Sequence, residues 1–146
     1  MLKIQNTLLF MLVLLSCGKD DNGDTALIEQ YLIENGISYV TTSSVYVHIK
    51  NQGSDIYPGD GSTVELAYTA AYLDGQVFDK TPENTYIKIN LKNAISGLAA
   101  GLKVLSKDSN GTIYIPSSQG YGSNPPFGVR KNAILVYQVY IHDINL

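Results

Sequence analysis

The feature that most constrains the fold is a regular alternation of apolar and polar side chains close to the C-terminus. Every second side chain from Leu135 to Ile141 is large and apolar, while Gln138, Tyr140 and His142 stand between and after them. A period of two is typical of a strand with one face in the core and the other face outside it. The segment is therefore predicted to be a central antiparallel strand whose odd-numbered side chains face inward.

The same period of two recurs earlier in the chain, between clusters of Gly and Pro. Three further strands are predicted from it, around Val45, Val47 and Ile49, around Val64, Leu66 and Tyr68, and around Ile87, Ile89 and Leu91. Asn110-Gly111 is predicted to form a tight turn that opens another strand at 111–115. The 11 Tyr and 13 Gly, with no Trp, also favour β surfaces and tight turns.

One internal segment changes to a helical period. Between Asn93 and Leu105, the residues Ile95, Leu98 and Leu102 follow one another at spacings of three and four, which places them on one stripe of a helix. A single short helix among antiparallel strands predicts an α+β fold, in which a curved half-barrel sheet wraps around that helix.

A second helix is predicted ahead of the strands. Asp24 or Thr25 is expected to cap it, it runs through Asn35, and Gly36 supplies the left-handed residue that ends it. Its apolar face is expected to pack on the domain itself or on a partner. That face consists of Leu27, Ile28, Tyr31 and Leu32.

The N-terminus has the composition of a secretory signal peptide. Residues 1–16 carry Lys3 and then an apolar run at 8–15, which is too short to span a bilayer. The Leu-Leu-Ser-Cys sequence at 14–17 resembles the bacterial lipobox, whose cysteine is acylated, with palmitate among the acyl chains, and becomes the mature N-terminus. Cys17 is therefore predicted to anchor a lipoprotein in the outer membrane.

The residues after Cys17 leave two interpretations open. Lys19, Asp20 and Asp21 resemble a signal that sends some lipoproteins to the cell surface, but the segment is equally typical of a polar tether. The domain is therefore expected either on the periplasmic side or on the cell surface. The predicted organisation is a signal peptide at 1–16, a tether at 17–23, a helix with its connector at 24–43 and one domain at 44–146.

Several classes of function are excluded by composition. The formal net charge of −3 offers no basic patch, so no nucleic-acid partner is expected. His48 and His142 are predicted on separate strands at solvent-facing positions, and with a single Cys in the chain neither a metal site nor an internal disulfide is expected. No phosphate-binding or dinucleotide motif and no nucleophile with its base is found. An enzyme of this sequence would therefore act through a shaped pocket, without a cofactor.

Four sequence blocks follow one another along the chain. They are VELAYTAAYLDGQVFD at 64–79, AISGLAAGL at 94–102, IPSSQGYG at 115–122 and NAILVYQV at 132–139. In this order they resemble the FKBP-type peptidyl-prolyl cis/trans isomerases, and the segment 46–61 is also similar to the first strand and turn of that family. The family fold is a half-barrel antiparallel sheet around one helix, which agrees with the periods found in the strands and the helix.

The resemblance implies a pocket for a prolyl ring. The residues it assigns to catalysis are Asp79, Tyr121, Tyr68 and Phe78. The residues it assigns to substrate binding are Ile95, Leu98, Ala94, Ile87, Phe127, Val129 and Tyr137, with Tyr86 as the alternative to Ile87 on the wall strand.

The roles of these residues are implied in the same way. Tyr121 would hold a substrate carbonyl through its hydroxyl, and Asp79 would lie near the rotating carbonyl or orient Tyr68. A carboxylate directly after a buried Phe is also typical of a turn or a cap, so the residues alone leave the role of Asp79 open.

The chain departs from the family pattern at four places. Leu98 replaces the Trp of the pocket floor, Tyr137 replaces a Phe, Val129-Arg130 replaces Ile-Pro and Ala70 replaces a Gly. The loss of a large flat indole predicts weaker binding of the prolyl ring and modest activity.

The predicted function is isomerisation of X-Pro bonds in proline-containing polypeptides, assisting the folding of envelope or outer-membrane proteins. Two alternatives stay open. The first is a chain-binding module of the same fold with weak or no isomerase activity, and the second is an accessory lipoprotein whose helix at 26–35 docks on an envelope complex.

Overall fold

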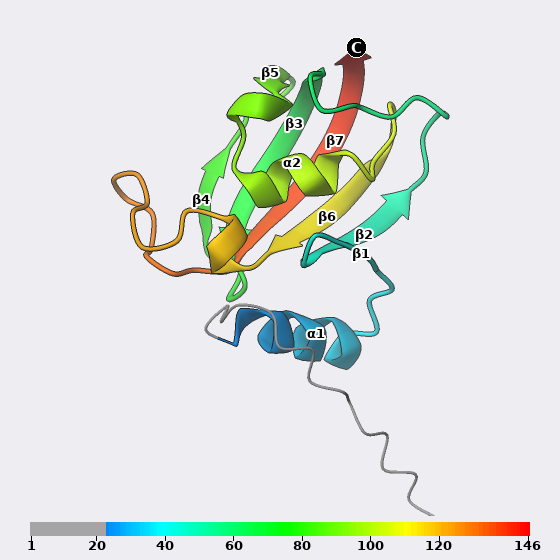
Figure 1. Ribbon diagram of the computed structural model, residues 1–146. Helices are drawn as coiled ribbons and strands as arrows, with labels where there is room; N and C mark the ends of the chain where they lie inside the picture. The colour runs from blue at the N-terminus through cyan, green and yellow to red at the C-terminus, as the bar shows by residue number, and fades with distance from the viewer. Residues whose placement is uncertain (1–22) are drawn as a thin grey trace, which may run out of the picture.

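The computed structural model describes residues 23–146, so the predicted signal peptide, Cys17 and the Lys19-Asp20-Asp21 segment lie outside the described residues. Over that range the strands form one antiparallel sheet in the order β1-β2-β6-β7-β3-β4, with β5 also paired to β3. Figure 1 shows the sheet curving around α2, whereas α1 lies below it. The predicted α+β half-barrel is confirmed.

The elements have the following bounds. The helices are α1 at Asp24–Glu34 and α2 at Ser96–Leu102, with short 3-10 turns η1 at Leu91–Asn93 and η2 at Ser117–Gln119. The strands are β1 at Val40–Thr42, β2 at Val45–Asn51, β3 at Thr63–Tyr72, β4 at Val77–Lys80, β5 at Ile87–Asn90, β6 at Asn110–Ile115 and β7 at Leu135–Asn145. None of the helices at 23–146 is both long and apolar enough to cross a membrane.

Strand β7 is the centre of the sheet, as the alternation predicted. It pairs with β6 on one side and with β3 on the other. Val139 and Ile141 are buried and Gln138 is exposed. Near its end β7 carries one extra residue between the partners of Glu65 and Leu66. Because this bulge shifts the alternation by one residue, the next buried side chain is Ile144.

Helix α2 is shorter than the predicted span of 93–105. It covers seven residues, Ile95 is the residue that precedes its first turn, and Leu105 belongs to the turn that follows it. The apolar stripe itself is correct, because Leu98, Leu102 and Leu105 are all buried. A helical spacing of apolar residues therefore continues here through flanks that are not helical but face the same core.

Two glycines let α2 approach the sheet closely. A Cβ atom at Gly97 would lie 2.3 Å from Cγ2 of Ile115, and one at Gly101 would lie 2.4 Å from Cγ2 of Ile113. These distances are far below ordinary van der Waals contact, so the backbone of α2 lies directly on the side chains of β6.

Helix α1 packs on the domain, on the side of the sheet opposite α2. Ile28 and Leu32 are fully buried, and Tyr31 contacts the ring of Tyr114 at 5.9 Å between centroids. Leu27, which was predicted on the same apolar face, is 51% exposed instead. The other buried residues of this second apolar cluster are Tyr46, Tyr114, Ile134 and Val136, and Ile37 and Leu73 are partly buried against it.

The predicted cap of α1 is wrong. Gly23, with φ of 81°, precedes the first turn, and Asp24 and Thr25 lie inside the helix. The Asp24 carboxylate is buried and accepts a 2.8 Å hydrogen bond from the backbone N–H of Ser117. Asp24 therefore ties the start of α1 to η2 rather than capping its own helix.

The predicted tight turn at Asn110-Gly111 is also wrong. Both residues belong to β6, and the chain turns earlier, around Asp108, whose φ is 63°. A Cβ atom at Gly111 would lie 2.5 Å from the carbonyl oxygen of His48 on β2, so glycine is needed there for close strand packing. The connector at 35–43 contains the short strand β1, which pairs with β2 and was not predicted.

Candidate active site

A β-bulge in β4 orients the two residues that the resemblance placed first. Ala70 of β3 pairs with Asp79, and Ala71 pairs with Val77, so Phe78 is an extra residue in β4. Ala70 is fully buried and faces the concave side, which places its partner Asp79 on that side as well. Phe78 packs against the core cluster on the same side. Two consecutive side chains thereby share one face, which a regular strand would not permit.

Asp79 accepts a hydrogen bond from the hydroxyl of Tyr68, with 2.5 Å between the Tyr68 oxygen and Oδ2. Tyr68 comes from the middle of β3 and is partly buried, whereas Asp79 is exposed. Burial, followed by the hydrogen bond to the Asp79 carboxylate, raises the pKa of Tyr68 above its usual value. The Tyr68 hydroxyl therefore stays protonated at neutral pH and remains a donor.

Tyr137 of β7 joins these side chains into one aromatic cluster. Its ring lies 5.6 Å from the ring of Tyr68 and meets Phe78 edge to face at 6.4 Å. Burial raises the pKa of Tyr137 well above its usual value, and the hydroxyl of Tyr121 adds to that effect. The site thus combines apolar ring surface with neutral hydroxyl groups and one carboxylate.

The first turn of α2 forms the apolar floor of this region. Leu98 is buried, and Ile95 and Ala94 are partly buried against the same core cluster that contains Tyr137. Leu98 lies where the resemblance expected a Trp, and it fills the floor with a smaller side chain. These three residues thus belong to the same core cluster as Tyr137, Tyr68 and Phe78.

The loop between η2 and β7 contributes Tyr121 and Val129. Both are partly buried and pack against the same core cluster. The backbone N–H of Asn132 donates to the carbonyl oxygen of Gly122 at 2.8 Å and closes the base of this loop. We name the segment 121–132 the flap. The flap lies next to the aromatic cluster, because the hydroxyl of Tyr121 interacts with the side chain of Tyr137.

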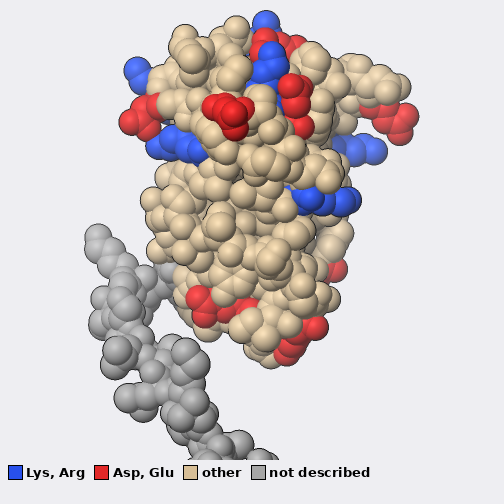
Figure 2. Space-filling view, turned by 90° about the vertical axis from the view of Figure 1, so that its right-hand side faces the viewer, with Lys and Arg blue, Asp and Glu red and all other residues tan. Residues whose placement is uncertain are grey.

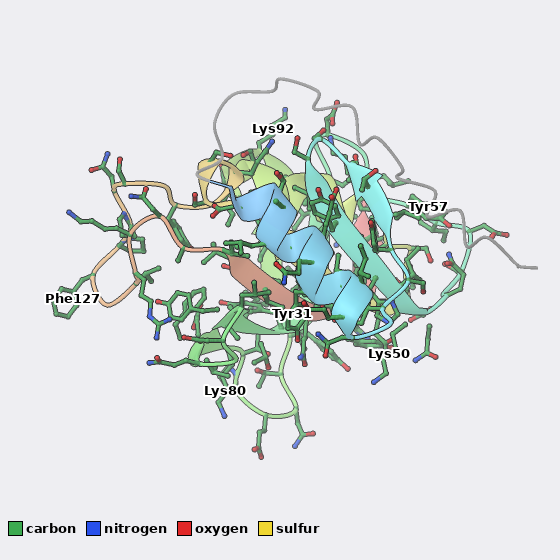
Figure 3. The ribbon with its side chains drawn as sticks, turned by 90° about the horizontal axis from the view of Figure 1, so that it is seen from below. Tyr31, Lys50, Tyr57, Lys80, Lys92 and Phe127 are labelled. Carbon is green, nitrogen blue, oxygen red and sulfur yellow. The ribbon has the colours of Figure 1, made fainter. Side chains whose placement is uncertain are left out.

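Two of the predicted substrate-binding residues stand apart from the rest. Phe127 is fully exposed at the tip of the flap, pointing away from the body of the molecule in Figure 3. Ile87 is paired with Leu66 and shares its face, but Ile89 is the residue of β5 that packs against the core. The alternative, Tyr86, is stacked on His142 with 4.2 Å between ring centroids, and His142 is exposed on the outer face of β7.

The structure adds Tyr72 and Arg130, which the sequence did not place in the site. The ring of Tyr72 stacks on Phe78 with 4.8 Å between centroids, and the guanidinium of Arg130 lies 4.2 Å from the centre of the Tyr72 ring. Tyr72 follows Tyr68 and Ala70 at every second position of β3. This alternation is the one feature of the sequence that could have indicated that Tyr72 faces the same side as the site. Arg130 was noted only as a departure from the family pattern.

The described residues contain no group of three or more His, Cys, Asp or Glu side chains that could hold a metal ion. On the face shown in Figure 2, acidic and basic side chains are scattered around a large uncharged area. The described site residues are therefore apolar rings, neutral hydroxyl groups and a single carboxylate, a combination suited to binding a neutral group.

Comparison with known proteins points to one family. A family model described as FKBP-type peptidyl-prolyl cis-trans isomerase matches residues 54–142. The chain is 28% identical over 117 residues to the FKBP-type peptidyl-prolyl cis-trans isomerase FkpA of Escherichia coli strain K12, which covers 80% of this chain and 43% of FkpA. It is 25% identical over 104 residues to Outer membrane protein MIP of Legionella longbeachae, covering 70% and 45% of the two chains.

The same similarity holds in three dimensions. The crystal structure of FkpA from Escherichia coli superposes with a TM-score of 0.72 at 26% identity, covering 86% of this chain and 61% of that chain. The chain spans less than half the length of the two curated relatives named above.

Proposed function

The chain belongs to the FKBP-type peptidyl-prolyl cis-trans isomerase family, and from this we propose that it catalyses the cis/trans isomerisation of X-Pro peptide bonds. The observation that carries the proposal is the bulge in β4, which places Phe78 and Asp79 on one face beside Tyr68. A carboxylate beside aromatic rings suits a site that holds a polar amide against apolar surface.

Isomerisation needs no covalent step. The barrier to rotation about a peptide bond is about 18 to 20 kcal/mol, and an uncatalysed X-Pro bond takes tens to hundreds of seconds to isomerise. At the top of the barrier amide resonance is lost, so the twisted amide is less dipolar than the planar one. A pocket lined by Phe78, Leu98 and Tyr137 favours the twisted state over the planar state.

The polar groups act on the carbonyl groups of the substrate. In the proposed mechanism the Tyr121 hydroxyl donates to a substrate carbonyl and holds the chain in place. Asp79 either lies near the rotating carbonyl or keeps the Tyr68 hydroxyl in position, and the hydrogen bond between Asp79 and Tyr68 supports the second role. The residue before proline would rest against Val129, which predicts a preference for apolar residues there.

The direct test is an isomerase assay with short X-Pro peptides. The wild-type protein is expected to accelerate isomerisation modestly, and Phe78→Ala to lose nearly all of that acceleration, because Phe78 supplies an apolar ring that packs with Tyr72 and Tyr137. Tyr86→Ala is a matched control, since it removes an aromatic ring that stacks on the outer face. A rate equal to the uncatalysed background for the folded wild type would contradict the proposal.

A second candidate function is that of a chain-binding module. It is favoured by Leu98, because a leucine offers a prolyl ring less flat surface than the Trp of the family pattern. The same experiment separates the two functions when peptide binding is measured alongside the rate. Binding that depends on Phe78 without any acceleration would support the binding module.

For the third candidate, docking of α1 on an envelope complex, only part of the apolar surface of α1 is available. Ile28 and Leu32 are buried against the sheet of this domain, whereas Leu27 and Ile33 remain exposed. If α1 docks on a partner complex, the double variant Leu27→Ser and Ile33→Ser should no longer capture that complex. Capture that is the same for the variant and the wild type would contradict docking through α1.

We also propose a location in the bacterial envelope, where slowly isomerising secreted or outer-membrane proteins would be the clients. The name of the relative from Legionella longbeachae, Outer membrane protein MIP, supports this, as does the lipobox at 14–17. Cys17 would carry the lipid anchor, and residues 17–23 would join it to α1.

The anchor is tested by labelling cells with a radioactive fatty acid. The wild type should take up label and Cys17→Ser should not, whereas an unlabelled wild type would contradict the lipoprotein proposal. Replacing Lys19, Asp20 and Asp21 by Ala should lower protease accessibility on intact cells if they direct surface display. Unchanged accessibility would leave this segment as a tether.

A further inference from the structure

Arg130 holds the flap in a way that the family pattern does not provide for. It lies in the last part of the flap, between Val129, which packs on the core, and Asn132, whose N–H closes the base of the flap. In the family pattern this part of the chain carries Ile-Pro, so a rigid residue has been replaced by a long cationic one. The question is what the guanidinium does there.

Among the described residues, the hydrogen bonds and the ring contact of Arg130 are made with one hairpin. Its Nη1 donates to Oδ2 of Asp74 at 2.6 Å, and its Nη2 donates to Oε1 of Gln76. Its backbone N–H donates to the Tyr72 hydroxyl at 2.9 Å, and its guanidinium lies over the Tyr72 ring. Tyr72, Asp74 and Gln76 belong to the end of β3 and the turn that leads into β4. One residue thus makes four contacts across the gap between the flap and the hairpin.

The turn that receives Arg130 is itself ordered. The backbone N–H of Gln76 donates to Oδ1 of Asp74 at 3.0 Å, which leaves Oδ2 for the guanidinium. The planar guanidinium can reach two acceptors and stack on a ring at the same time, whereas the single ammonium of a lysine cannot. A solitary exposed ion pair contributes little, so the set of contacts matters more than the pair with Asp74.

The hairpin connects Arg130 to the site. Phe78 and Asp79 follow the turn directly on β4, and the Tyr72 ring that lies beneath the guanidinium also stacks on Phe78. On the other side, Arg130 belongs to the flap that carries Tyr121. The two halves of the site, one on β4 and one on the flap, are therefore joined through Arg130 and Tyr72.

We propose that Arg130 is a positioning residue that fastens the flap to the β3–β4 hairpin and so fixes Tyr121 and Val129 relative to Phe78 and Asp79. The proposal rests on the proposed function for its catalytic consequence. Its structural consequence, a flap whose base opens less often, can be measured without any activity.

The experiment compares Arg130→Met, Arg130→Lys and the control Lys131→Met, which removes the adjacent exposed cation. Two quantities are measured for each variant, kcat/KM on X-Pro peptides and the hydrogen-exchange rate of the Asn132 amide that bonds to Gly122. Arg130→Met is expected to lower kcat/KM three- to tenfold and to speed Asn132 exchange at least fivefold. Arg130→Lys should resemble Arg130→Met, and Lys131→Met should stay within twofold of wild type in both.

The outcomes separate this proposal from the proposed function. A role limited to overall stability would speed exchange of amides in β7 and in the flap alike and leave kcat/KM per folded molecule unchanged, which would overturn the proposal. Unchanged Asn132 exchange in Arg130→Met would also overturn it. If the wild type is inactive, faster Asn132 exchange together with weaker binding of a proline peptide by Arg130→Met would still support the fastening role while the isomerase function fails.

Discussion

The hydrogen bond between Tyr68 and Asp79 can be tested by a double-mutant cycle, because its two partners differ in exposure. Tyr68 is partly buried among Phe78 and Tyr137, whereas the Asp79 carboxylate reaches solvent. Tyr68→Phe leaves a carboxylate that water can hydrate, so it should cost no more than about 1 kcal/mol. Asp79→Ala leaves a partly buried hydroxyl without its acceptor, which should cost about 1 to 2 kcal/mol.

The cycle is measured by urea unfolding at pH 7 for the wild type, both single variants and the double variant. A coupling energy of about 1 kcal/mol is expected, since each single variant removes the same bond. Asp55→Ala serves as the control, because Asp55 is an exposed carboxylate outside the site. In the isomerase assay Asp79→Ala should lower the rate about tenfold, equal to about 1.4 kcal/mol of transition-state stabilisation, with peptide binding almost unchanged.

A coupling energy indistinguishable from zero would refute this reasoning. So would a larger loss of stability in Tyr68→Phe than in Asp79→Ala, because the order of the two costs follows from which partner is buried. A tenfold loss of rate in Asp79→Ala without coupling would mean that the carboxylate acts on the substrate directly and does not position Tyr68.

Three further predictions concern packing, pH and the floor of the site. A Cβ atom at Gly53 would lie 2.0 Å from the carbonyl oxygen of Lys107, so Gly53→Ala should lower the free energy of unfolding, measured by urea titration, by about 2 kcal/mol or more. At the control position Gly59 the nearest atom would be 3.9 Å from the added Cβ, so Gly59→Ala should change that free energy by no more than about 0.5 kcal/mol. Burial raises the pKa of Tyr114 from 10.0 to about 12. As the pH rises, the unfolded chain therefore loses the Tyr114 proton before the folded protein does. The free energy of unfolding keeps the full contribution of this group below about pH 10, and between about pH 10 and about pH 12 it falls by up to about 1.4 kcal/mol per pH unit. Urea unfolding across this range should show a shallower fall for Tyr114→Phe than for the wild type. Leu98→Trp should tighten proline-peptide binding in a titration and cost about 1 to 3 kcal/mol of stability, because the added ring must fit a buried floor.

The strands were predictable where only one face of the sheet is covered by the core. In β7 the side chains from Val139 to Ile141 obey a period of two because water lies on their other side. Tyr46 and Tyr114 are buried although they occupy the outward positions of their strands, since α1 covers that side. A strand covered on both faces has no period to detect, so the place where α1 docks had to come from the structure.

The errors at Asn110-Gly111 and at the ends of α2 share a physical cause. A glycine that permits close packing looks the same in a sequence as a glycine that permits a turn, and Gly111 is of the first kind because β2 passes so near. Likewise, apolar residues at helical spacing mark a common buried face, which continues past the last hydrogen-bonded turn of α2 to Leu105. Both patterns report contact with the core and only indirectly report backbone conformation.

The candidate site was assembled from a resemblance, and the structure explains why its residues meet. Phe78 and Asp79 face the same side because of a β-bulge, and no pattern of neighbouring residues in the sequence predicts that bulge. The contact between Arg130 and Asp74 joins residues 56 positions apart, so it could not be predicted from spacing. Phe127 was assigned to substrate binding, but few packing contacts fix an exposed loop tip, and here Phe127 extends away from the site.

The N-terminal helix α1 also helps to hold the flap in place. The buried Asp24 carboxylate holds the backbone of Ser117, and η2, which begins there, leads directly into Tyr121 and the flap. Arg130 fastens the other end of the flap to the hairpin that carries Phe78. Since a buried carboxylate is stable only when its partner is in place, α1 and η2 must keep their mutual position for the domain to be stable. The orientation of the flap relative to residue 24 is therefore set by the fold.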